Sequence, residues 1–209
     1  MRPFVSLHAR ACPLPIANLD TDQLIPARFM RRPRSEGYGP FLLYDLRRRA
    51  DGELDPDFPV NAEAYTGAEI LVARRNFGGG SSREAAVYAL ADHGFRAVIA
   101  PSFGDIFASS AIKNGLLPAR VEDADAEALI AALRSREIAS LAIDLPKQTI
   151  IASDATIAFS IDPVWKRQLL NGWDDIDLTL NEAPAIAAFR ANDERARPWS
   201  TPRREGSGS

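Results

Sequence analysis

The chain has 209 residues, which is enough for one substantial core but marginal for two domains. Apolar residues make up 46% and charged residues 25%, and a net charge of −3 gives no electrostatic case for binding nucleic acid or an anionic membrane. No apolar run approaches the ~18 residues that a membrane-spanning helix needs, and the N-terminus lacks the features of a secretory signal. We therefore expect a cytoplasmic protein with no nucleic-acid and no membrane partner.

Cysteine usage limits the metal chemistry of the chain. Cys12 is the only cysteine. It cannot form an internal disulfide, and alone it cannot supply the several thiolates that an iron–sulfur cluster needs. The sequence therefore predicts no metal site in this chain, and any cluster with which the protein works must lie on another chain.

The first third of the chain shows little sustained periodicity. Residues 13–40 are rich in Pro, Gly, Asp and Arg and are typical of ordered loops around short strands. Residues 51–61 form a turn-rich connection. We therefore expect these segments to be organised by contacts with the rest of the fold.

The middle of the chain alternates between strand and helix patterns. In chain order it predicts a strand at 68–74, a glycine-rich turn at 76–82, a helix at 83–92 closed by Gly94, a strand at 96–100, a helix at 105–114, a strand at 117–121, and a helix that starts at Asp123 as its N-cap and runs through Leu133. This alternation is typical of parallel βαβ units.

The last part of the chain changes pattern. Residues 141–161 alternate between apolar and polar positions with two breaks, which favours antiparallel hairpins. Asp162 and Pro163 open a short helix, and Gly172 closes it. The sequence as a whole predicts an α/β fold with a mixed sheet.

The domain organisation follows from these patterns. We predict one domain over residues 1–194. Residues 195–209 are polar and end in Gly-Ser-Gly-Ser, and we expect them to be a disordered tail.

The most informative segment is Asn76-Phe77-Gly78-Gly79-Gly80-Ser81-Ser82-Arg83-Glu84. Consecutive glycines let the backbone approach a ligand closely and permit positive φ angles. Two hydroxyls and a guanidinium follow at the start of a helix, whose N-terminus offers free N–H groups and a partial positive charge. A guanidinium can hold a carboxylate or phosphate bidentately. The residues alone therefore predict an anion site with a serine at its centre.

Other interpretations of this loop compete with the anion site. A glycine-rich turn is often only a tight connection, with Ser as the helix N-cap and Glu completing a capping box. The lysine of a phosphate loop and the Gly-x-Gly-x-x-Gly dinucleotide pattern are both absent. The serines do not lie in the Gly-x-Ser-x-Gly frame of a hydrolase. Only His8 and His93 are available as bases, and His93 is more simply a residue that caps the end of a helix.

The loop resembles the active-site loop of the swivelling domain in aconitase-type hydro-lyases. Upstream, Asn18-Leu19-Asp20-Thr21-Asp22-Gln23-Leu24-Ile25-Pro26 is similar to the opening motif of the small subunits of 3-isopropylmalate dehydratases. Further matches occur, in order, at residues 55–58, 95–103, 105–107, 114–118 and 170–172. The resemblance covers residues 4–190, and this co-occurrence is far more specific than the loop alone.

The resemblance implies a fold and an activity. The fold would be a single swivelling β/β/α domain like the fourth domain of aconitase. Such subunits cap a large subunit that carries a [4Fe–4S] cluster, and the active site lies between the two chains. The reaction moves a hydroxyl between adjacent carbons of a small dicarboxylate, through an alkene. The expected activity is the isomerisation of 2-isopropylmalate and 3-isopropylmalate through isopropylmaleate in leucine biosynthesis, with no cofactor bound by this chain.

The resemblance also assigns roles within the glycine–serine loop. Ser81 would be the general base that removes a proton from carbon. Ser82 and Arg83 would bind the substrate carboxylate next to the reacting carbon. Gly79 and Gly80 would complete the substrate-binding loop.

Two further residues are assigned from the segments that precede this loop. Asp22 would orient the site, with a turn-forming role as the alternative. The segment 28–38 would correspond to the substrate-selecting loop. Within it, Arg34 would contact a second carboxylate, with a solvated loop charge as the alternative.

The chain departs from the usual family pattern at several positions. Gly79 stands where the family has Cys, and Ala85 where it has His. Ser110 and Lys113 replace asparagines in the helix that follows, although Asn114 remains. These departures suggest a divergent paralogue. The open alternatives are therefore the same chemistry on a citraconate, maleate or dimethylmalate type of substrate, or a non-catalytic regulatory partner of a large subunit.

Overall fold

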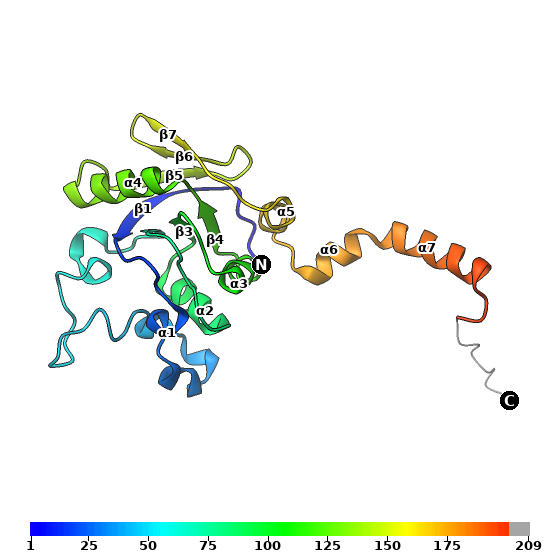
Figure 1. Cartoon of the computed structure of the whole chain (residues 1–209), viewed down its shortest axis with the longest axis horizontal. Helices are drawn as coiled ribbons and strands as arrows, with labels where there is room; N and C mark the ends of the chain where they lie inside the picture. Colours follow the sequence, from blue (N-terminus) through cyan, green and yellow to red (C-terminus); the bar gives the residue numbers. More distant parts are fainter. Residues whose placement is uncertain (201–209) are drawn as a thin grey trace. The chain divides into compact units, whose positions relative to one another are not determined.

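The computed structural model describes residues 1–200 (Figure 1). The chain divides into two compact units, residues 1–172 and the segment from Trp173 onward. The sequence indicated one domain over residues 1–194, and that assignment stays a prediction. Of the tail predicted at 195–209, residues 201–209 lie outside the described residues, and helix α7 ends at Ala196.

A mixed seven-stranded sheet organises the first unit, in the order β4-β3-β2-β1-β5-β6-β7. The strands are β1 (Ser6–Leu14), β2 (Ile70–Ala73), β3 (Ala97–Ala100), β4 (Leu117–Arg120), β5 (Ser140–Asp144), β6 (Thr149–Ala152) and β7 (Ala155–Ala158). Strands β1 to β4 pair in parallel, and β1, β5, β6 and β7 pair antiparallel. The predicted α/β fold, with parallel βαβ units and C-terminal antiparallel hairpins, is therefore confirmed.

Strand β1 joins the two halves of the sheet. Its first half, from Ser6 to Arg10, pairs antiparallel with β5, and its second half, from Ala11 to Leu14, pairs in parallel with β2. A long central strand of this kind fixes the parallel and antiparallel halves in one register. It therefore holds the carboxyl edge of β2, where the glycine–serine loop begins, in a defined place.

Helices cover both faces of the sheet (Figure 1). The helices of the βαβ run are α2 (Glu84–His93), α3 (Asp105–Lys113) and α4 (Asp123–Ser135). Leu71 on β2 packs in one buried cluster with Leu90 of α2. Its neighbour Ile70 packs in a second buried cluster with Leu129 of α4. Successive strand residues thus point to opposite faces, which explains why these strands are apolar throughout.

The remaining helices are α1 (Thr21–Leu24), α5 (Pro163–Asn171), α6 (Asp175–Asn181) and α7 (Ala183–Ala196). Asp162 caps α5 and Gly172 closes it, as predicted. Gly94 closes α2 in the left-handed conformation, also as predicted. The N-cap predicted for α4 is wrong by one residue, because Glu122 is the N-cap and Asp123 lies in the first turn. In that position the negative charge of Asp123 still interacts favourably with the positive end of the helix dipole.

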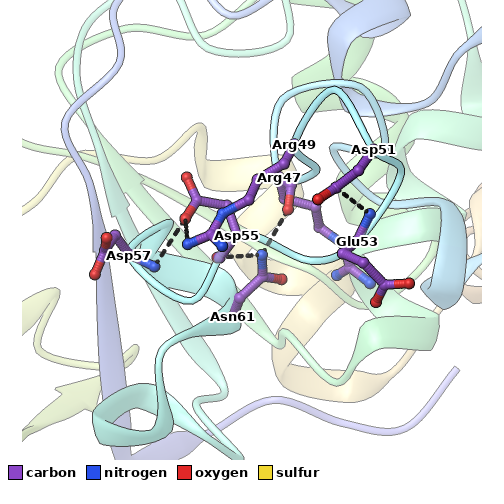
Figure 2. A network of polar contacts seen from close by, with 7 residues as sticks. All are labelled: Arg47, Arg49, Asp51, Glu53, Asp55, Asp57 and Asn61. Atoms are coloured by element: carbon purple, nitrogen blue, oxygen red, sulfur yellow. Dashed lines mark hydrogen bonds and ion pairs between the residues drawn. The ribbon is translucent and has the colours of Figure 1, made fainter.

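Segments without long helices are held by local polar contacts. The predicted turn-rich connection illustrates this (Figure 2). The side-chain amide of Asn61 donates to the carbonyl groups of Arg47, at 2.7 Å, and Asp55, at 2.8 Å. The Asp55 carboxylate in turn accepts from Arg49 at 3.3 Å. Within residues 1–200, no helix is long and apolar enough to cross a membrane.

Candidate active site

The glycine–serine loop lies between the carboxyl end of β2 and the start of α2, and the segment 19–21 holds it from one side. The Gly78 N–H donates to the Leu19 carbonyl at 2.7 Å. Thr21 donates its N–H to the Gly79 carbonyl at 3.0 Å and its hydroxyl to the Ser81 carbonyl at 2.8 Å. Loop carbonyl groups are therefore occupied by this segment, which fixes the loop backbone.

The connection between β3 and α3 holds the loop from a second side. Gly104 donates its N–H to the Phe77 carbonyl at 2.9 Å. Gly78 has φ +69°, and a Cβ atom there would lie 2.3 Å from the ring of Phe107. A Cβ on Gly104 would lie 2.4 Å from the Gly78 carbonyl oxygen. Glycine is required at both positions because backbone and aromatic ring approach so closely.

The N–H groups of the loop are left open. Among the described residues, the backbone N–H groups of Gly80, Ser81 and Ser82 have no intramolecular hydrogen-bond acceptor. Both serine side chains are exposed. The N-cap of α2 is Arg83, without a side-chain capping bond, so the alternative of a Ser cap with a Glu84 capping box is wrong. Free N–H donors and hydroxyls at one helix N-terminus favour an anionic ligand.

Arg83 and Asp22, both predicted as site residues, are brought together beside this loop. The Arg83 guanidinium forms an ion pair with the Asp22 carboxylate. Asp22 lies in the first turn of α1, where the capping residue is its neighbour Asp20. The Arg83 side chain is 21% exposed. The capping role at this turn therefore belongs to Asp20, while the Asp22 carboxylate pairs with Arg83; its role in orienting the site stays a prediction.

Arg34 is placed differently. It lies in a 3₁₀ turn (Arg34–Glu36) and forms two hydrogen bonds with Asp92 at the end of α2, at 2.7 and 2.9 Å. Within residues 1–200, no hydrogen bond or ion pair joins Arg34 to the loop 78–83. Its role as a second carboxylate contact stays a prediction.

One departure from the family pattern, Gly79, has a local explanation. A Cβ on Gly79 would lie 2.9 Å from the side-chain oxygen of Asn76, so a cysteine there would have to displace that carboxamide. The Asn76 carboxamide instead donates to Asn18 at 3.1 Å. Asn114, the family asparagine that remains, is the C-cap of α3 and donates to Glu84 in the first turn of α2 at 3.0 Å.

Sequence reasoning did not single out Thr21, Glu84 or Asp92. Thr21 lies inside the opening motif at 18–26, which was the available signal for it. The partners of Glu84 and Asp92 are 30 and 58 residues away in the sequence, so no local pattern reveals them.

The residues of this chain do not fit an iron–sulfur cluster. Cys12 lies on β1, is 1% exposed, and burial raises its pKa to about 12. It is therefore a protonated thiol in the core and no ligand. Among the described residues, no group of three or more His, Cys, Asp or Glu side chains could hold a metal ion.

Comparison with known proteins first defines the class. The aconitase C-terminal domain family matches residues 1–124, more than half of the chain. The chain, with its mixed sheet covered by helices on both faces, is therefore a domain of the aconitase class.

The particular family follows from full-length relatives. The 3-isopropylmalate dehydratase small subunit of Teredinibacter turnerae is 43% identical over 208 residues, covering 95% of this chain and 97% of that protein. The corresponding subunit of Gluconacetobacter diazotrophicus is 46% identical over 202 residues, covering 96% and 98%. The crystal structure of 3-isopropylmalate dehydratase from Methanocaldococcus jannaschii matches with a TM-score of 0.61 and 26% identity, covering 88% of this chain and 99% of that one. The chain belongs to the family of 3-isopropylmalate dehydratase small subunits.

Proposed function

We propose that this chain is the small subunit of a heteromeric, cytoplasmic hydro-lyase that isomerises 2-isopropylmalate and 3-isopropylmalate through isopropylmaleate in leucine biosynthesis. The relatives named as small subunits of that enzyme over almost the whole chain support the substrate. The observation that carries the proposal is the open loop, in which free N–H groups, two exposed hydroxyls and Arg83 meet at the start of α2.

In this proposal the chain supplies the base and the carboxylate contacts. Ser81 takes the proton from the carbon next to a substrate carboxylate and returns it in the reverse direction. A serine oxygen can do so only where negative charge is strongly stabilised, and the free N–H groups and positive end of α2 provide that stabilisation. Ser82 and Arg83 bind the carboxylate. Arg83 donates one N–H to Asp22, and its other N–H groups remain available to bind the substrate carboxylate.

The partner and the cluster complete the proposal. We expect a large subunit to bind this chain and to carry the [4Fe–4S] cluster, since Cys12 is buried and protonated. The active site would then lie between the two chains, and the open face of the loop would meet the large subunit only when the complex forms.

Substitution of the base tests this assignment. In the complex with a large subunit, Ser81→Ala should lower kcat by about 10²–10⁴-fold, because general-base catalysis typically contributes that much. Exposed Ser140 on β5 provides the matched control, and Ser140→Ala should leave kcat unchanged. Co-elution with the large subunit on size-exclusion chromatography should be the same for both variants. Full turnover by Ser81→Ala would rule out Ser81 as the base.

A further inference from the structure

The segment 28–38, which precedes the glycine–serine loop in the chain, is fastened to the far end of α2 by one carboxylate. Both terminal nitrogens of Arg34 donate to Asp92, at 2.7 and 2.9 Å. The Tyr38 N–H donates to the same carboxylate at 2.6 Å. The Asp92 side chain is 22% exposed, so these bonds are only partly screened by water.

Aromatic and backbone contacts support this attachment. The Arg34 guanidinium lies 4.3 Å from the ring centroid of Tyr88, which is on α2 one turn before Asp92. A Cβ atom on Gly39 would lie 2.7 Å from the Asp92 carbonyl oxygen. The backbone that follows the segment therefore approaches the end of α2 as closely as a glycine allows.

The same short helix carries the candidate active site at its other end. Helix α2 begins after Arg83 and ends at His93, so it is about 15 Å long at 1.5 Å per residue. One rigid element thus connects the serine loop to the contacts of Arg34 and Tyr38.

We infer that Asp92 is a positioning residue that, through Arg34 and the Tyr38 N–H, fixes the segment 28–38 on the helix that presents Ser81. This inference rests on the proposed function and on the substrate-selecting role that the family resemblance implies for that segment. In this inference Arg34 is the partner of Asp92, since both terminal nitrogens of Arg34 donate to the Asp92 carboxylate. Asp92 touches neither substrate nor reacting atoms and acts by holding the segment in register with the loop.

A double-mutant cycle in the reconstituted complex tests the inference. We expect Asp92→Asn and Arg34→Ala each to raise KM for isopropylmaleate about tenfold, with kcat changed less than about twofold, because a bidentate charged pair is lost in either case. The double variant should be no worse than the single ones, since all three remove the same contact. Glu127→Gln, which weakens the exposed two-bond Arg74–Glu127 pair outside the segment, is the matched control and should leave KM unchanged.

A different kinetic pattern would overturn the inference. If Arg34→Ala raises KM while Asp92→Asn leaves it unchanged, Arg34 contacts the substrate directly and Asp92 does not position the segment. Equal falls in kcat and stability for all variants would equally exclude a positioning role.

Hydrogen exchange of the isolated chain separates this inference from the proposed function. We expect the amides of residues 34–41 to exchange at least about tenfold faster in Asp92→Asn than in the wild type or in Glu127→Gln, because opening of the segment in Asp92→Asn no longer has to break the Asp92 bonds. If the exchange rates of these amides are unchanged in Asp92→Asn, the inference is wrong, whether or not the complex is active. Turnover by the wild-type complex decides the proposed function independently.

Discussion

Burial of single titratable side chains gives two predictions at the scale of the residue. The first concerns Cys12, whose pKa burial raises to about 12. Because the thiolate is the reactive form, we expect iodoacetamide to alkylate the native chain at pH 8 about 100-fold more slowly than the unfolded chain. Mass spectrometry of the reaction in buffer and in concentrated guanidinium chloride measures both rates. Similar rates would show that Cys12 is accessible and ionised.

The second residue-scale prediction concerns His93. Burial lowers its pKa, and the positive charge of Arg47 lowers it further. The unfolded chain therefore binds a proton near the ordinary pKa of 6.5 while the native state still resists it. The stability that neutral His93 contributes is present above pH 6.5 and is lost as the pH falls toward the native pKa.

A matched pair of variants measures this pH dependence. Between pH 7 and pH 5, His93→Gln should lose less free energy of unfolding in urea than the wild type does. The exposed His8 on β1 provides the control, since His8→Gln should keep the wild-type profile. If the wild type and His93→Gln lose the same free energy of unfolding, His93 is not the group responsible.

At the scale of the element, the approach of α3 to the serine loop sets a steric prediction. Gly78 and Gly67 share a positive φ, of +69° and +72°, but only Gly78 faces a neighbour, the ring of Phe107. Gly67→Ala should cost about 1 kcal/mol of conformational strain. Gly78→Ala should cost about 2–3 kcal/mol more, because the Cβ overlaps the ring. If both variants lose the same free energy of unfolding in urea, α3 moves away from the Cβ atom at position 78 without an energetic cost.

The elements also show how much of the fold could be predicted from the sequence. The βαβ run was predictable because each strand is a short run of apolar residues and a glycine closes α2. Strand β1 was not assigned, since its halves pair with different partners and Pro13 lies opposite Val72 in a central ladder, where proline is unusual. The first half of β1 nevertheless carries a local signal, since residues 5–11 alternate between apolar and polar side chains. Only the second half, Ala11–Leu14, depends on its pairing with β2.

The same distinction holds for the candidate site. The loop 76–84 was found from its residues, because glycines, serines and an arginine before a helix have local physical meaning. The contact of Thr21 with the Ser81 carbonyl joins residues 60 apart, and the Arg34–Asp92 pair joins residues 58 apart. Such contacts follow from the fold, so the sequence could not show that Arg34 pairs with Asp92.

At the scale of the whole molecule, the chain carries half of the proposed chemistry. In the proposal, the open loop supplies the base and the donors that bind the substrate carboxylate, while Cys12 is buried and cannot serve as a cluster ligand. We therefore expect the isolated chain to be colourless and to turn over no substrate. Visible absorbance from a cluster in the purified chain would contradict this division between two subunits.

The most direct test is anaerobic reconstitution with a large subunit of 3-isopropylmalate dehydratase, followed by assay of the hydration of isopropylmaleate, citraconate and maleate. The proposed function predicts that the complex hydrates isopropylmaleate, in preference to the other two alkenes, and that neither chain alone does so. Hydration of citraconate or maleate but not isopropylmaleate would contradict the proposed substrate. A stable complex that hydrates none of the three would contradict the catalytic role itself.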